Sequence, residues 1–124
     1  MKYDLNRVRE ECLKLMGWRV TNHYQPPRWW NRDDPPEANT RTIDDLPDPT
    51  RSLDDALPLL HIYGIELHPE EHDPVTYRAV SRSPKDVMLR GFEPDVENEN
   101  PALAVCLCAL LNAGRDLKEF EVSP

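Results

Sequence analysis

The sequence predicts an α+β fold in which a small antiparallel sheet of three or four strands has helices packed on its faces. Three observations lead to this prediction. Apolar residues recur at helical spacing near both ends and in the middle of the chain, period-two alternation lies between these segments, and the connections are short enough only for antiparallel pairing. The expected element order is α-β-β-α-β-β-α. A chain of 124 residues has room for one core, so residues 1–124 should form a single domain.

The first helix is expected to begin after Asp4, which suits an N-cap, and to end before Gly17, which suits the left-handed position after a helix. Its apolar face consists of Leu5, Val8, Cys12, Leu15 and Met16. Polar residues, Arg9 among them, form the opposite face, which we expect to be in solvent.

A short hairpin is expected next, because Trp18 and Val20 alternate with polar residues and Trp29 and Trp30 follow a polar turn. Pro26-Pro27 should prevent regular pairing within that turn. Neighbouring residues on a strand point to opposite faces, so one of the two tryptophans can fill the core while the other is exposed or covered by the following loop.

Residues 31–50 are predicted to form a long acidic, proline-rich loop with scarcely any apolar periodicity. Loops of this length are more often functional or mobile than purely structural. The next helix should begin at Ser52, where Ser52 and Asp55 have the spacing of a capping box, and end at Gly64. Pro58 should either kink this helix or move its start to a later residue.

Strand-like segments follow at 65–68, 76–81 and 87–92. The last helix should begin with Asn100 as N-cap and Pro101 at the first helical position, and end at Gly114. Residues 102–111 are apolar all round, which predicts a helix covered on most sides at the centre of the fold.

This order of elements resembles the phage ABA sandwich domain, a family of small phage and prophage proteins. The resemblance covers nearly the whole chain and rests on Met16-Gly17-Trp18, Trp30, Leu46-Pro47, Ser52 with Asp54-Asp55-Ala56, and Pro101 to Leu110. It implies a phage or prophage origin, a three-layer arrangement of helices around a sheet, and a small accessory role. The longer, more acidic loop and Pro58 depart from the family pattern.

The formal net charge of −8 and pI near 4.9 disfavour direct nucleic-acid binding and favour a basic groove on another protein as partner. No stretch approaches the roughly 20 apolar residues of a membrane span, and the N-terminus lacks a signal peptide's apolar core, so we expect a cytosolic protein. Its odd number of cysteines, Cys12, Cys106 and Cys108, indicates buried thiols in a reducing compartment.

No familiar catalytic motif is present, and we expect neither an enzyme nor a cofactor. Cys106 and Cys108 diverge by about 200° on a helix and so cannot chelate one ion together. The segment from His68 to His72 has metal-ligand residue types, but Pro69 and Pro74 argue against the helix that would align them, so a solvated turn is favoured over a metal site.

Two surfaces are candidates for binding. The first is the aromatic and basic group Arg28, Trp29, Trp30 and Arg32, which could anchor a ligand or partner, although core and loop packing is the favoured explanation of the two tryptophans. The second is the acidic loop, in which Asp33, Asp34, Asp44, Asp45 and Asp48 could meet the arginines and lysines of a partner, although most such runs are solvated loop.

The leading expectation is a non-enzymatic phage-type protein that inhibits a host protein, plausibly part of CRISPR-type nuclease immunity, by occupying its surface. An alternative is an anti-defence protein that sequesters a nucleotide signal between aromatics and arginines. A virion accessory role is a second alternative.

Overall fold

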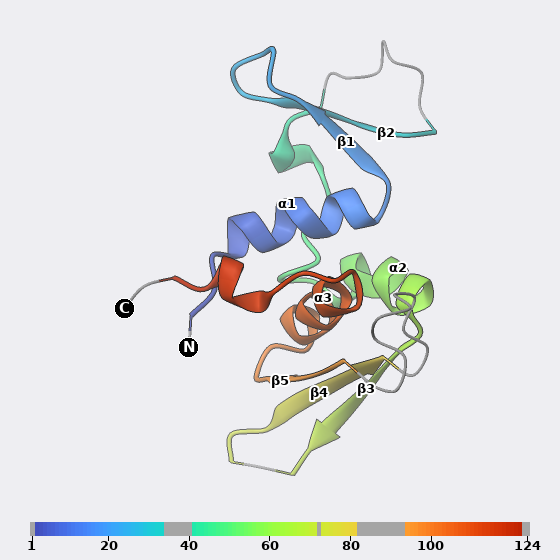
Figure 1. Ribbon diagram of the computed structural model, residues 1–124, viewed down its shortest axis with the longest axis vertical. Helices are drawn as coiled ribbons and strands as arrows, with labels where there is room; N and C mark the ends of the chain where they lie inside the picture. Colours follow the sequence, from blue (N-terminus) through green and yellow to red (C-terminus); the bar gives the residue numbers. More distant parts are fainter. Residues whose placement is uncertain (1, 34–40, 72, 82–93, 123–124) are drawn as a thin grey trace.

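The computed structural model describes residues 2–33, 41–71, 73–81 and 94–122, which form three α-helices, two short 3-10 helices and five strands (Figure 1). In chain order they are α1 (Leu5–Leu15), β1 (Trp18–Thr21), β2 (Arg28–Asn31), η2 (Ile43–Asp45), α2 (Leu53–Tyr63), β3 (Ile65–Glu70), β4 (Thr76–Ser81), β5 (Asp95–Asn98), α3 (Pro101–Asn112) and η4 (Leu117–Phe120). The predicted α+β class with antiparallel strands is confirmed. The expected strand at 87–92 lies outside the described residues.

The helix boundaries follow the predicted capping residues. The side chains of Asp4, Ser52 and Asn100 accept backbone N–H groups in the first turns of α1, α2 and α3 respectively. Gly64 ends α2 in the left-handed conformation with φ 58°. Pro58 lies inside α2, so the alternative of a later helix start is wrong: the Ser52 cap already fixes the first turn.

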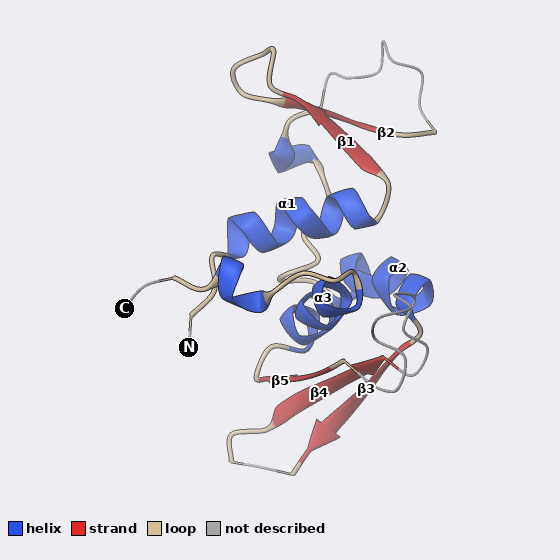
Figure 2. Ribbon diagram, viewed as in Figure 1, coloured by secondary structure: helices blue, strands red, loops and turns tan. Residues whose placement is uncertain are grey.

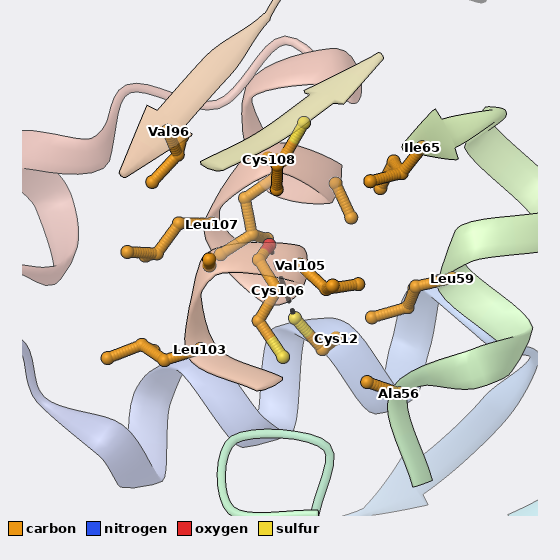
Figure 3. Close-up of a cluster of buried hydrophobic side chains, with 14 of the residues drawn as sticks. Cys12, Ala56, Leu59, Ile65, Val96, Leu103, Val105, Cys106, Leu107 and Cys108 are labelled. Atoms are coloured by element: carbon orange, nitrogen blue, oxygen red, sulfur yellow. Dashed lines mark hydrogen bonds between the residues drawn. The ribbon is translucent and has the colours of Figure 1, made fainter. Parts of the chain in front are cut away.

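Helix α3 is the centre of the molecule, as its uniformly apolar sequence predicts. Ten of its twelve residues are buried. It lies between α1 and the three-stranded sheet, and Figure 3 shows its side chains meeting Cys12 of α1, Leu59 of α2 and Val96 of β5. A smaller cluster, Leu13, Trp29 and Leu46, fills the space beneath the hairpin.

The strands are divided between two sheets instead of forming one (Figure 2). Strands β1 and β2 form the expected hairpin, and β3, β4 and β5 form an antiparallel sheet in that order. Helix α1 separates the two, so they lie at opposite ends of the longest axis (Figure 1). Strand β5 was not predicted, because its alternation of acidic residues with a single valine reads as an exposed acidic stretch.

The two ends of the described chain meet beside α1. Tyr3 forms an antiparallel bridge with Glu121, and Phe120 of η4 is buried in the main cluster. No helix in the described part of the chain is long and apolar enough to cross a bilayer.

Candidate binding surfaces

The three thiols are buried in the core, where each donates to a backbone carbonyl. Cys106 Sγ lies 3.1 Å from the carbonyl oxygen of Pro49, while Cys108 Sγ lies 3.5 Å from that of Pro94, so the two side chains diverge as predicted (Figure 3). The pKa of Cys106 is raised well above its usual value by a hydrogen bond with the Cys12 thiol and by burial. Burial raises the pKa of Cys108 to about 12. Thiols with such raised pKa values are poor nucleophiles at neutral pH.

The candidate metal-ligand segment begins on a strand. His68 lies on β3, where its Nε2 is 3.7 Å from Oε2 of Glu66, and His72 lies outside the described residues. Among the residues that the structure describes, no three histidine, cysteine or acidic side chains are grouped to hold a metal ion.

Two carboxylates of the acidic loop already accept hydrogen bonds from backbone and hydroxyl groups of the same loop. The Asp48 carboxylate accepts from the backbone N–H and the hydroxyl of Thr50, at 3.1 and 2.6 Å. It also lies within ion-pair distance of Arg9 and Arg51. The Asp45 carboxylate closes the capping box of η2 with Thr42. These two aspartates therefore stabilise the loop, which reduces what they can offer a partner.

Arg9 holds this loop against α1. Its guanidinium donates to the carbonyl oxygens of Ile43, Leu46 and Pro47 at 2.7, 2.8 and 3.2 Å. Its side chain is only 16% exposed, so the expectation that it lies on the solvent face of the helix is wrong. The long stem of an arginine can cross an apolar surface to reach such acceptors, which helical periodicity alone does not reveal.

The other predicted loop carboxylates differ in their positions. Asp33 and Asp44 are exposed, and Asp34 lies outside the described residues. Asp44 borders a hollow of about 320 Å³ between α1 and η2, together with Arg9 and Glu10. Among the described loop residues, Asp33 and Asp44 are therefore the two predicted aspartates that remain candidates for contact with a partner.

The outer face of the three-stranded sheet carries a denser group of carboxylates that the sequence analysis did not single out. The register pairs His68 with Arg78, Arg78 with Glu97, and Val80 with Asp95. Because paired residues share a face, Arg78 is surrounded there by Glu66, Glu70, Asp95 and Glu97. Arg78 Nε lies 3.3 Å from a Glu70 oxygen and 3.5 Å from an Asp95 oxygen.

We call this group the acidic sheet face: Glu66, Glu70, Arg78, Asp95 and Glu97. Its members lie up to 31 positions apart in the sequence, so a search for consecutive charged residues does not reveal them. Glu66, Asp95 and Glu97 are exposed, and the opposite face of the sheet packs on α3.

The aromatic and basic group of the hairpin is split between its two faces. Trp29 is 3% exposed and packs in the small cluster with Leu13 and Leu46. Trp30 points to the other face, where the register places it opposite Arg19. The Arg28 guanidinium stacks 4.0 Å from the centroid of the Tyr24 ring.

Arg32 has a more structural position than predicted. Its backbone N–H donates to the carbonyl oxygen of Gly17, and its side chain occupies the space in front of that glycine, with Nε 3.4 Å from where a Cβ on Gly17 would lie. Gly17 has φ +100°, which an L side chain rarely adopts, so Arg32 covers a glycine that the chain reversal requires.

The comparisons with protein-family models, curated proteins and solved structures find no match to this chain.

Proposed function

We propose that this protein is a non-enzymatic interaction protein that binds a basic surface of a partner protein through the acidic sheet face. The observation that carries the proposal is the gathering of four carboxylates around one arginine on the outer face of the three-stranded sheet. The next turn adds Glu71 and Asp73, so the edge of this face is acidic too. Such a surface steers a basic partner and selects against acidic ones.

A binding role is favoured over catalysis by the state of the candidate nucleophiles. The three thiols are buried among apolar side chains, and the pKa values of Cys106 and Cys108 are raised, away from the thiolate form that a cysteine nucleophile requires. The exposed carboxylates of the acidic sheet face stand on strands of the same sheet, where one macromolecular surface can contact several of them.

The partner that best fits this surface is a protein that itself handles nucleic acid, because its groove carries arginines and lysines spaced to meet phosphates. Following the resemblance to phage proteins, we propose a component of host nuclease immunity, inhibited in the bacterial cytoplasm by occupation of that groove. Nucleotide sequestration is the alternative that the experiment below separates from this proposal.

The test compares two variants with the same change of charge. Glu66→Lys with Glu97→Lys alters the acidic sheet face, whereas Asp33→Lys with Asp44→Lys alters the exposed aspartates of the loop. Tagged proteins are incubated in host lysate at low salt, the captured protein is identified by mass spectrometry, and its purified activity is measured with and without each variant. Circular dichroism checks that both variants are folded.

We expect the unaltered protein and the loop variant to capture and inhibit one stoichiometric host protein, with release as salt screens the contact. The sheet variant should lose both capture and inhibition. Capture that depends on the loop and not on the sheet would assign the interface to the loop instead. A recovered protein that carries only a small added mass would support nucleotide sequestration and overturn the proposal.

A further inference from the structure

The outer face of the hairpin β1–β2 brings together two arginines and an indole. The register pairs Arg19 with Trp30 and Thr21 with Arg28, so these four side chains stand side by side on one face. The other face of the same hairpin, with Trp29, packs in the small cluster, so this face is turned away from the core. We call it the basic hairpin face.

The arginines of this face lack the carboxylate partners that arginines have elsewhere in the molecule. Among the described residues, Arg19 and Arg28 make no ion pair, and Arg28 instead stacks on Tyr24, which is 42% exposed. By contrast, ion pairs are formed by Arg7, Arg9, Arg51, Arg78 and Arg115. The chain has 23 acidic residues and 15 basic ones, so two neighbouring arginines without a carboxylate partner in the described part of the chain are unexpected on the basic hairpin face.

The composition of the basic hairpin face is that of a protein-binding surface. Tryptophan, tyrosine and arginine are the residues most enriched among those that dominate interface energies. Between Gly17 and Asp33 the chain has three arginines and a single carboxylate, whereas 65–81 and 94–99 together have seven carboxylates and one arginine. The described hairpin is therefore locally basic and the described three-stranded sheet locally acidic, and the two lie at opposite ends of the longest axis (Figure 1).

We infer that the basic hairpin face docks on the acidic sheet face of a second copy of this chain. The two surfaces have opposite charge, and each lies on the side of its sheet that faces away from the packed side, with Arg19 exposed on the hairpin and Glu66, Asp95 and Glu97 exposed on the sheet. The contact is heterologous, because the two faces differ, so each copy can bind one neighbour through each end and the assembly grows with concentration. A contact made by one hairpin is small, which makes it weak and salt-sensitive.

Self-association of this kind would affect the binding of a partner protein. The acidic sheet face would be covered by a hairpin when the protein is concentrated and exposed when it is dilute. A basic partner would therefore compete with self-association for the same carboxylates.

The test uses neutralising variants and sedimentation velocity over a concentration series at low salt. The hairpin variant carries Arg19→Gln and Arg28→Gln, and the sheet variant carries Glu66→Gln and Glu97→Gln. The unaltered protein should sediment faster as concentration rises, and each variant alone should remain monomeric. An equimolar mixture of the two should form a 1:1 dimer and grow no further, because only the sheet variant's intact hairpin and the hairpin variant's intact sheet can meet.

Matched controls apply the same change of net charge elsewhere on the surface. Glu10→Gln with Asp44→Asn matches the sheet variant, and Arg51→Gln with Lys118→Gln matches the hairpin variant. Both controls should associate as the unaltered protein does.

Three outcomes would overturn the inference. They are a monomer at every concentration, controls that lose association as fully as the variants, and a mixture that stays monomeric. If the monomer instead binds ATP, used as a nucleotide probe, and the hairpin variant does not, the basic hairpin face is a nucleotide site. In every one of these cases, capture of a basic host protein can still succeed or fail separately, so the two proposals are distinguishable.

Discussion

Replacing Arg9 by methionine should lower the stability of the folded chain substantially, although the residue lies on a surface helix. Methionine keeps the apolar stem but removes the guanidinium that bonds three loop carbonyls. A hydrogen bond to a charged group contributes about 1.5–3 kcal/mol, and an acceptor left without its partner loses part of that stabilisation. Water can re-solvate some of the three carbonyls, so we expect a net loss of about 3 kcal/mol, below the sum of the bonds.

This loss corresponds to a readily measured change in melting temperature. With an unfolding entropy of about 2.1 cal/mol/K per residue, a loss of about 3 kcal/mol lowers the Tm of a chain of this length by about 11 °C. Differential scanning calorimetry or urea unfolding followed by circular dichroism gives the value. Arg9→Lys should recover only part of the loss, because a single ammonium cannot reach three acceptors in the fixed geometry of a guanidinium.

The matched control is Arg51→Met, which removes another arginine beside the same Asp48 carboxylate. The Arg51 side chain is 76% exposed and makes a 3.7 Å ion pair, so its loss should cost less than about 1 kcal/mol. Equal effects of the two substitutions on Tm would refute the assignment of Arg9 as the residue that fastens the loop to α1.

Three further predictions concern the caps, the hairpin and the thiols. Asn100→Ala should destabilise by about 1–2 kcal/mol in urea unfolding, since it removes the α3 cap and a 2.8 Å bond to the Thr50 carbonyl; Asn100→Asp, which retains the cap acceptor, should lose less. Trp29→Ala should cost about 3–5 kcal/mol and Trp30→Ala much less, and similar costs would contradict the assigned faces. The thiol of Cys108 is neutral in the folded state up to its raised pKa of about 12, whereas in the unfolded chain it ionises from its ordinary value of 9.0, so stability should fall between about pH 9 and 12 and Cys108→Ala should make that fall shallower.

The sequence was sufficient to predict features that depend on local chemistry. Caps and stops act within one turn of a helix, so Asp4, Asn100 and Gly64 marked helix boundaries reliably. The all-apolar run of the last helix predicted its central position, because no face of it could be left in water. The hairpin was predicted because Trp18 and Val20 alternate with polar residues.

Features that depend on long-range pairing were not predicted. Strand β5 has one apolar residue, Val96, and it is a strand because β4 supplies its hydrogen bonds and α3 covers that valine. Likewise the Arg9 side chain is largely covered because it bonds a loop that lies 34 to 38 positions later in the chain. The acidic sheet face exists only in the register of three strands, so no window along the sequence contains it.

The same distinction decides which carboxylates are available to a partner. Sequence reasoning favoured the loop because its aspartates are close together along the chain, but a carboxylate that already accepts bonds from the backbone or from the protein's own arginines has fewer acceptor positions left for a new cation. Asp45 and Asp48 are in that position, whereas Asp95 is exposed and, among the described residues, lies 3.5 Å from Arg78 without accepting a backbone hydrogen bond. An arginine or lysine of a partner can join that pair without breaking a backbone hydrogen bond. On the acidic sheet face, a cation of a partner can therefore pair with a carboxylate without disrupting hydrogen bonds that hold the fold. A mutational search for the interface should begin there.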